Sequence, residues 1–464
     1  MTELRLSDVT FAYDGEESPV VEHFSYEIDS GTISLVSGPS GCGKSTLFRL
    51  MAGLLPQYGG RVTSGCVMLE NAEMEAIVPF ERARRVAMLF QNPGRQFAMR
   101  TVQDQFVFAL ENLQVEPDEI MKRTDEALAQ FGLEDFRNRD LQELSGGEQQ
   151  RIALALVCSL GSSVILLDEP FANVDPENRA RLLQDLKELR DCRQKTILIS
   201  DHDPSGYGGI ADHWYHFTKN GFFEEDAGHL GGEAAEPVVT GTAKTPARLE
   251  WSGLGYSAGS RKLLSDSAFG LPTGQMGLLS GRNGCGKSTL FSCLCGLHEK
   301  SGRVLLDGRD SAGIKPVKWA RDVGYVFQNS TDQFIRVSVE EEIEASRKNT
   351  MHRDYWSDGR IHEAVEALNL AGVMEHSVYQ ISGGQQKKLQ MLVMLIMAPT
   401  VLLADEPFAG LDAQSLATVL KLMRRVTDDL NLSVLVISHQ RAGVTGFMDY
   451  EVRIENGSLR EVSA

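Results

Sequence analysis

The sequence predicts an α/β protein built from two consecutive domains, and three observations lead to this fold class. A chain of 464 residues is too long for one ordinary core but suits two. A long-period repeat divides it, since GPSGCGKSTL from Gly38 recurs as GRNGCGKSTL from Gly281. Within each copy, short apolar runs typical of buried parallel strands alternate with helical patterns.

The repeat continues along both copies. LSGGEQQR from Leu144 recurs as ISGGQQKK from Ile381, an offset of 237 (381 − 144). ILLDEPFANVD, which ends at Asp175, recurs as LLADEPFAGLD, which ends at Asp412, with the same offset (412 − 175). We therefore predict that the two domains share one plan and differ in length only between the first motif and the later ones.

The elements of the first copy follow from its patterns. Strands are predicted for residues 4–13, 31–38, 163–170 and 196–202, which alternate in polarity or run apolar. Residues 45–55 continue from a glycine turn as a helix. Residues 117–132 predict an inserted helix, because Pro117 stands near its start and Gly132 at its stop.

The domain boundaries follow from a change in composition. Residues 226–247 are rich in Gly, Ala, Thr and acidic residues and show no periodicity, so we predict a flexible linker between domain 1 (residues 1–225) and domain 2 (residues 248–464). A flexible stretch of this length reaches roughly 25 Å, enough for the domains to meet face to face.

Charge and composition exclude several classes of protein. The net charge of −18 argues against a protein that grips nucleic-acid phosphates, so we expect no nucleic-acid partner. Residues 1–225 hold 36 acidic and 21 basic residues, and residues 226–464 hold 28 and 25, so the halves carry −15 and −3. The longest apolar stretch, interrupted by Pro399, is too short to span a bilayer, and the N-terminus does not resemble a secretory signal. Seven cysteines predict reduced thiols rather than a disulfide framework.

The two glycine-rich motifs match G-x-x-x-x-G-K-[ST] between a predicted strand and helix. Such glycines let backbone N–H groups surround a β-phosphate, while the lysine reaches the β and γ oxygens and the serine ligates Mg²⁺. The candidate nucleotide-binding residues are Gly38, Ser40, Gly41, Cys42, Gly43, Lys44, Ser45 and Thr46 in the first copy and Gly281, Asn283, Gly284, Cys285, Gly286, Lys287, Ser288 and Thr289 in the second.

Acidic and histidine residues end the later apolar strands of each copy. Asp168 and Asp405 are predicted to face the metal, and the adjacent Glu169 and Glu406 are placed to polarise an attacking water. His202 and His439 each follow the aspartate of their copy by 34 residues (202 − 168, 439 − 405) and are predicted to hold the γ-phosphate and the water.

An aromatic residue precedes each motif lysine by 31 positions (44 − 13, 287 − 256). We predict that Tyr13 and Tyr256 stack on adenine, although a tyrosine in either place is also compatible with a role in the core.

These motifs together, and above all LSGGEQQR, closely resemble the ATP-binding-cassette (ABC) ATPases over nearly the whole chain outside the linker. The resemblance implies two P-loop ABC-type nucleotide-binding domains, each with a RecA-like core, an antiparallel β subdomain and a helical insertion. It also implies a head-to-tail sandwich in which the serine-glycine-glycine block of one domain caps the ATP of the other. The cofactors expected are ATP and Mg²⁺.

Two composite sites follow from that resemblance. One joins Lys44, Ser45, Gln91, Asp168, Glu169 and His202 to Ser382, Gly383 and Gly384; the other joins Lys287, Ser288, Gln328, Asp405, Glu406 and His439 to Ser145, Gly146 and Gly147. The metal ligands expected are Ser45, Gln91 and Asp168, and Ser288, Gln328 and Asp405. Since both sites keep the glutamate and the histidine, we predict that both hydrolyse ATP.

The second block departs from the common pattern. Ile381 replaces leucine, Gln385 replaces the Glu148 of the first block, and Lys388 replaces Arg151. Because this block would cap the first site, we expect that site to be the slower one.

A glutamine-framed stretch occurs twice, as FQNPGRQF at residues 90–97 and FQNSTDQF at 327–334. It resembles the extra glutamine-bearing segment of energy-coupling-factor (ECF) importers, whose ATPases drive uptake of vitamins and transition-metal ions. The resemblance implies a transmembrane T-like scaffold and a substrate-binding membrane subunit as partners, and a peripheral place on the cytoplasmic face of the cell membrane. Acidic residues that follow the stretch are candidates to receive the scaffold's basic helices, or else form a solvated acidic helix: Asp104, Glu111, Glu340, Glu341 and Glu342.

Two alternatives remain beside this interpretation. A tandem ATPase of a conventional sugar importer usually carries a degenerate catalytic set in one half, whereas both sets here are whole. A soluble ABC-F-type translation factor usually has a long charged helical arm between its domains, and this chain has only a short Gly/Ala/Thr linker.

Overall fold

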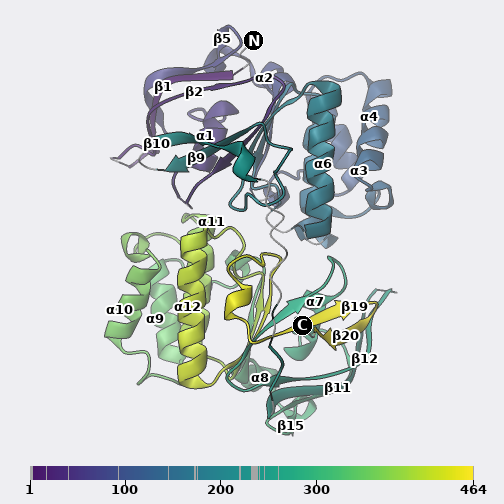
Figure 1. Ribbon diagram of the computed structural model, residues 1–464, viewed down its shortest axis with the longest axis vertical. Helices are drawn as coiled ribbons and strands as arrows, with labels where there is room; N and C mark the ends of the chain where they lie inside the picture. Colours follow the sequence, from purple (N-terminus) through teal and green to yellow (C-terminus); the bar gives the residue numbers. More distant parts are fainter. Residues whose placement is uncertain are drawn as a thin grey trace. The chain divides into compact units, whose positions relative to one another are not determined.

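The computed structural model divides the chain into two compact units, a first unit of residues 1–234 and a second unit of residues 235–464 (Figure 1). It describes residues 4–16, 18–39, 41–91, 93–144, 146–171, 174, 176–218, 221–230, 239, 241–244, 246–259 and 261–462. Each unit is α/β with one antiparallel and one mostly parallel sheet. The repeated α/β fold class is therefore confirmed.

The first unit begins with a four-stranded antiparallel sheet of order β2-β1-β4-β5. Its strands are β1 (Leu4–Ala12), β2 (Val21–Ile28), β4 (Arg61–Leu69) and β5 (Ala72–Glu73). A six-stranded sheet of order β10-β9-β3-β8-β7-β6 contains β3 (Ile33–Ser37), β6 (Val86–Leu89), β7 (Val164–Asp168), β8 (Thr196–Ser200), β9 (His213–Thr218) and β10 (Gly221–Glu225). Only β10 pairs antiparallel in this second sheet.

Helices cover the parallel sheet of the first unit. They are α1 (Lys44–Met51), α2 (Pro79–Arg85), α3 (Val102–Asn112), α4 (Pro117–Gln130), α5 (Gly146–Ser159) and α6 (Pro176–Arg193). The 3₁₀ turns are η1 (Met74–Ala76), η2 (Pro93–Arg95), η3 (Glu134–Phe136), η4 (Leu141–Glu143) and η5 (Ala227–Leu230). The predicted helix at 117–132 is thus α4, and α3 and α4 together form the insertion between β6 and β7.

Alternate side chains of the parallel strands enter two different cores. Ile165 and Leu167 of β7 pack with α3 to α6, whereas Val164 and Leu166 pack with α1 and the antiparallel sheet. A strand buried on both faces must be apolar throughout, which explains the unpatterned runs in the sequence.

The second unit repeats this arrangement. Its antiparallel sheet has the order β12-β11-β14-β15, from β11 (Ala247–Ala258), β12 (Arg261–Pro272), β14 (Ser301–Leu306) and β15 (Arg309–Asp310). Its six-stranded sheet has the order β16-β17-β18-β13-β19-β20, from β13 (Met276–Ser280), β16 (Val323–Val326), β17 (Val401–Asp405), β18 (Ser433–Ile437), β19 (Tyr450–Glu455) and β20 (Ser458–Glu461).

The helices of the second unit also follow the first. They are α7 (Lys287–Leu294), α8 (Pro316–Asp322), α9 (Val339–Asn349), α10 (Asp358–Ala367), α11 (Gly383–Met397) and α12 (Ala413–Leu430), with the 3₁₀ turns η6 (Ser311–Gly313), η7 (Ser330–Asp332), η8 (Ala371–Val373) and η9 (Thr445–Phe447). Figure 1 shows α9, α10, α11 and α12 gathered beside the sheet.

The predicted linker has a structured start and end. At its start, η5 places Leu230 in the core of the first unit. Val239 is buried in the core of the second unit, and β11 begins at Ala247. Residues 231–238, 240 and 245 of this linker lie outside the described residues.

Candidate functional site

In the first unit, the glycine-rich loop encloses its own lysine. Gly38, Gly41 and Gly43 have φ of +150°, +78° and +108°, which side-chain-bearing residues rarely adopt. A Cβ at Gly38 would meet the Phe217 carbonyl oxygen at 2.0 Å. Lys44 is 5% exposed, and its Nζ donates to the carbonyl of Gly38 at 2.7 Å. The loop therefore holds the Lys44 ammonium group where it can contact a bound phosphate.

The loop of the second unit has the same design. Lys287 is 7% exposed, and its Nζ donates to the carbonyls of Gly281 at 2.7 Å and Arg282 at 3.2 Å. The glycines at 281, 284 and 286 have φ of +145°, +72° and +103°. In both units the helix that follows begins at the lysine, so its first N–H groups point into the loop. Ser40, a predicted contact in the first unit, lies outside the described residues.

The two tyrosines differ in exposure. The Tyr13 hydroxyl is 3.0 Å from the Thr46 hydroxyl, and its ring is partly exposed. Tyr256 is 4% exposed, packs in the core of the second unit and donates to the Gly286 carbonyl at 2.8 Å. The Tyr13 hydroxyl thus contacts the helix that follows the phosphate loop, the Tyr256 hydroxyl contacts the loop itself, and adenine stacking stays a prediction.

The carboxyl ends of the parallel strands bring the other candidates of the first unit together. Asp168 ends β7 and accepts a hydrogen bond from the Ser200 hydroxyl at 2.6 Å. Burial and the charge of Glu169 raise the pKa of Asp168, while hydrogen bonds from Ser200 and Ser45 act in the opposite direction. The Ser45 hydroxyl and the Asp168 carboxyl therefore lie near each other.

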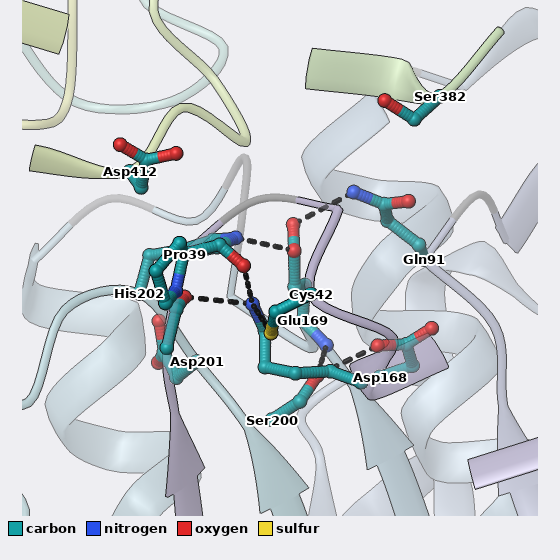
Figure 2. Close-up of polar contacts among 12 residues, drawn as sticks. Pro39, Cys42, Gln91, Asp168, Glu169, Ser200, Asp201, His202, Ser382 and Asp412 are labelled. Carbon is teal, nitrogen blue, oxygen red and sulfur yellow. Dashed lines mark hydrogen bonds and ion pairs between the residues drawn. The ribbon is translucent and has the colours of Figure 1, made fainter. Parts of the chain in front are cut away.

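Glu169 stands at the centre of this cluster, as Figure 2 shows. Its Oε2 accepts from Gln91 Nε2 at 2.8 Å, and its Oε1 lies 2.7 Å from His202 Nε2. Burial by itself raises the pKa of Glu169, but the charge and hydrogen bond of His202, helped by Lys44 and Gln91, outweigh it and hold the pKa below its usual value. The carboxylate is therefore ionised at neutral pH and able to accept a proton.

The equivalent glutamate of the second unit has different surroundings. Glu406 Oε1 lies 3.5 Å from His439 Nε2 and makes no hydrogen bond among the described residues, while Oε2 accepts from the His439 backbone at 3.3 Å. Burial and the charge of Asp405 raise the pKa of Glu406 to about 8, against the opposing effect of Lys287. Glu406 therefore holds its proton more firmly than Glu169 does.

Each strand-end aspartate has a hydroxyl donor that sequence reasoning missed. Asp168 has Ser200, whereas Asp405 accepts from the Tyr325 hydroxyl at 3.1 Å. The first copy has Met88 where the second has Tyr325 (325 − 237). When the two copies are aligned, each of these hydroxyl residues stands where the other copy has an apolar residue. This difference is the sequence signal that could have identified them.

The serine-glycine-glycine blocks begin the helices α5 and α11. Gly146 and Gly147 form the first turn of α5, and Ser145 lies outside the described residues. In the second unit, Ser382 caps α11 before Gly383 and Gly384; its backbone N–H donates to Gln385 Oε1 at 2.9 Å, and its hydroxyl accepts from the Gln385 N–H at 3.3 Å. Gln385, a departure from the first block, thus completes a capping box.

The donor set in each unit suits Mg²⁺. The Ser45 and Ser288 hydroxyls lie near enough to Asp168 and Asp405 to lower the pKa of these carboxyl groups, so a hydroxyl and a carboxylate lie together beside each phosphate loop. Hard oxygen ligands of this kind are those that Mg²⁺ prefers. Gln91, also a predicted ligand, instead turns its amide to Glu169 in this structure.

A glycine loop around a buried lysine, followed by a hydroxyl and a strand-end carboxylate, defines a P-loop nucleotide hydrolase, and this chain carries the set twice. The family model described as "ABC transporter" matches residues 21–172 and 264–409. The chain belongs to this family and is an ATPase with two tandem nucleotide-binding domains.

Relatives match along the whole chain. A putative ABC transporter ATP-binding protein of Treponema denticola is 31% identical, with 99% of this chain and 96% of the relative covered. The putative HMP/thiamine import ATP-binding protein YkoD of Bacillus subtilis is 28% identical, with 96% and 88% covered. The solved structure of an RNase-L inhibitor shares the fold at 18% identity, with a TM-score of 0.64 over 98% of this chain and 90% of that one. Within the described residues, no helix has the length and apolar character needed to cross a bilayer.

Proposed function

We propose that this chain is the ATP-hydrolysing, energising subunit of an ECF-type importer. In this proposal it acts on the cytoplasmic face of the membrane through a T-like transmembrane scaffold and a substrate-binding membrane subunit. The observation that carries the proposal is the glutamine-framed loop, which both units build in the same way and finish with different exposed side chains.

The second glutamine of each loop braces it from inside. Gln96 Oε1 accepts from the Phe90 N–H at 3.0 Å, and its Nε2 donates to the Met88 carbonyl at 2.9 Å. Gln333 makes the same pair of bonds to Phe327 at 3.1 Å and Tyr325 at 3.0 Å. The glutamines thereby fix η2 and η7 and set the direction in which the chain leaves each loop.

A second brace holds the segment that follows. Gln105 Oε1 accepts from the N–H groups of Ala98 and Met99 at 2.8 and 3.0 Å. Glu342 occupies the same place in the second unit and accepts from Ile335 and Arg336 at 3.0 and 2.7 Å. Rigidly held backbone of this kind is suited to receive a helix of a partner protein.

The braced segments expose different chemistry. The first unit presents Ala98 and Arg100, whereas the second presents Ile335 and Val337, which are 73% and 67% exposed. Exposed aliphatic side chains of this kind, two residues apart on a braced segment, are available to pack against a partner helix. This difference supports docking of two unlike scaffold helices, one on each unit.

The acidic candidates divide into exposed and buried ones. Asp104, Glu111, Glu340 and Glu341 are exposed and remain candidates to receive basic helices. Glu342 is 4% exposed and accepts hydrogen bonds from the backbone of its own loop, so we propose the scaffold contact for the four exposed residues only. Its carboxylate takes the place of Gln105, which braces the corresponding loop of the first unit.

Within this proposal each unit supplies one catalytic set. Lys44 and Lys287 contact the β- and γ-phosphates, Glu169 and Glu406 accept the proton of the attacking water, and the histidines hold the γ-phosphate. Bound Mg²⁺ neutralises charge on the phosphate oxygens. The blocks beginning at Ser145 and Ser382 each cap the nucleotide of the opposite unit through hydroxyl and N–H groups at a helix start.

The cargo is proposed to be a vitamin, a transition-metal ion or a similar micronutrient. The printed name of the YkoD relative, an HMP/thiamine import protein, supports a vitamin-related cargo. A conventional ABC importer is the alternative within the same family, and it differs in lacking the T-like scaffold.

Co-purification tests the proposal. The full chain, expressed in its own cells and isolated from detergent-solubilised membranes, should bring with it one scaffold-like and one substrate-binding membrane protein. Ile335→Asp with Val337→Asp should reduce recovery of the scaffold at least tenfold, because a charge in an apolar contact is strongly unfavourable.

The matched control is Val317→Asp, an equally exposed valine (75%) on α8. It should leave recovery unchanged. Recovery of ribosomes alone would contradict the transporter assignment, and equal loss with Val317→Asp would contradict the assigned surface.

A further inference from the structure

Two buried polar residues distinguish α11 from its counterpart α5. The second copy has Lys387 and Gln390 where the first has Gln150 and Ala153 (387 − 237, 390 − 237). Lys387 is 6% exposed and Gln390 is fully buried. Buried ammonium and amide groups are costly unless they are paired, so their partners indicate what they do.

Both side chains bind the loop that contains Gln328. Lys387 Nζ donates to the Gln328 carbonyl at 2.6 Å and to Gln390 Oε1 at 3.2 Å. Gln390 Nε2 donates to the Phe327 carbonyl at 2.8 Å and to Gln333 Oε1 at 2.9 Å. Ser330 Oγ donates to Gln390 Oε1 at 3.1 Å, so the network ties α11 to the start, middle and end of the loop.

The first unit holds its loop without this network. Gln150 donates to the backbone carbonyl of Glu169 at 3.4 Å, Ala153 has no polar side-chain atom, and Pro93 stands where the second copy has Ser330. There the Gln91 amide bonds directly to the Glu169 carboxylate. The two halves thus position the same two catalytic candidates by different means.

Lys387 also acts on the acidic end of β17. Its ammonium attracts the carboxyl groups of both Asp405 and Glu406. Glu406 Oε1 has no hydrogen-bond donor among the described residues, and the charges of Lys287 and, to a smaller extent, Lys387 favour the ionised form of this carboxyl group.

We propose that Lys387 and Gln390 are positioning residues peculiar to the second unit, which hold the Gln328 loop against α11. The inference rests on the proposed catalytic roles of Gln328 and Glu406 but not on the identity of the membrane partners. It predicts an effect on hydrolysis at the Lys287 site and none at the Lys44 site.

Hydrogen exchange tests the holding role without depending on activity. In the full chain, Lys387→Met should raise amide exchange of residues 327–336 at least tenfold, because the loop loses its donor to the Gln328 carbonyl. The control Lys348→Met changes an exposed lysine on α9 that pairs with Glu344 and should leave exchange unchanged. Unchanged exchange in Lys387→Met would overturn the proposal.

Single-turnover hydrolysis tests the catalytic consequence. With the first site disabled by Glu169→Gln, Lys387→Met should lower the rate at least fivefold and change the affinity for ATP less than twofold. Lys387→Gln should recover at least half of the rate, since the first unit's Gln150 shows that an amide fits there.

The opposite background identifies the site through which Lys387 acts. With the second site disabled by Glu406→Gln, Lys387→Met should leave the rate within twofold. A loss confined to this background would show that Lys387 acts through the serine-glycine-glycine block and would overturn the proposal, as would an unchanged rate in both backgrounds. An unchanged rate in Gln328→Ala would instead refute the catalytic role of Gln328. This result is distinguishable from the outcomes for Lys387→Met.

Discussion

The strand-end glutamates have the same backbone and different partners. Glu169 and Glu406 have φ of 51° and 46°, a left-handed conformation that is uncommon outside glycine. Their N–H groups donate to Ser200 and Ile437 of the neighbouring strand at 3.0 Å, which holds the bend in place. Strain of this kind is typical of functional sites.

Removing either carboxylate should abolish the chemistry of its own site. We expect Glu169→Gln and Glu406→Gln each to reduce single-turnover hydrolysis at that site at least 100-fold, because a general base typically contributes this much. Nucleotide binding, measured by equilibrium titration, should change little. A mutant that hydrolyses at the parental rate at both sites would contradict the assigned role.

A buried ion pair in the second unit predicts a pH-dependent stability. The Glu451 side chain is fully buried and accepts from Arg441 at 2.7 Å and Ser280 at 2.6 Å. Burial alone raises the pKa of Glu451, but these hydrogen bonds and the charges of Arg441 and Arg453 bring it below its usual value.

A depressed pKa in the folded state adds stability above the unfolded-state pKa of about 4.3, and this stability is lost as the pH falls through the folded value. Glu451→Ala should therefore destabilise the second unit by about 3 kcal/mol at pH 7, since it removes the buried carboxylate that pairs with Arg441. The deficit should shrink below pH 4. Unfolding followed by exchange of the β13 and β19 amides measures it, and a deficit that does not vary with pH would refute the linkage.

At the scale of elements, the two histidine loops are held by different packing. Arg179 on α6 donates to Asp203 at 2.5 Å and Asp201 at 3.1 Å, the residues on either side of His202. Tyr207 also donates to Asp201, at 2.8 Å. In the second copy the positions of Arg179, Asp201, Asp203 and Tyr207 hold Leu416, Ser438, Gln440 and Val444, so none of these four positions carries a charge there.

Loss of Arg179 should therefore affect one site only. We expect Arg179→Met to destabilise the first unit by about 3 kcal/mol, because Asp201 stays buried without its cation. Hydrolysis at the Lys44 site should fall, and hydrolysis at the Lys287 site should not. The matched change, Leu416→Met in the second unit, should cost less than about 1.5 kcal/mol.

The sequence predicted the helices and strands better than the buried polar side chains that hold the site together. The periodicity of residues 117–132 and the apolar runs at 163–170 and 196–202 identified α4, β7 and β8, because burial imposes those patterns directly. The helix predicted at 45–55 ends earlier, at Met51, where the chain turns at Gly53. Ser200, Tyr325 and Lys387 escaped prediction, since a lone polar residue in an apolar run has no periodic signal and acquires its role only through a long-range contact.

At the scale of the whole molecule, the duplication keeps the chemistry and changes the surroundings. Both units retain the phosphate loop, the strand-end acids and the histidine, while the charge of residues 1–225 is −15 and that of residues 226–464 is −3. Two domains with the same catalytic motifs and different net charges suit a protein whose two halves dock on different partners. The buried differences at Lys387 and Arg179 extend this asymmetry to the sites themselves.

We propose that each unit caps the nucleotide bound by the other. It is tested in the full chain with the seven native cysteines replaced, Ser145→Cys and Ser382→Cys introduced together, and an ATP analogue that carries a thiol-reactive group on its γ-phosphate. With Lys44→Ala, only the second unit binds nucleotide, and we expect label at position 145 and none at 382; with Lys287→Ala, the positions exchange. Label on the block of the unit that binds the nucleotide, or on neither block, would contradict the account.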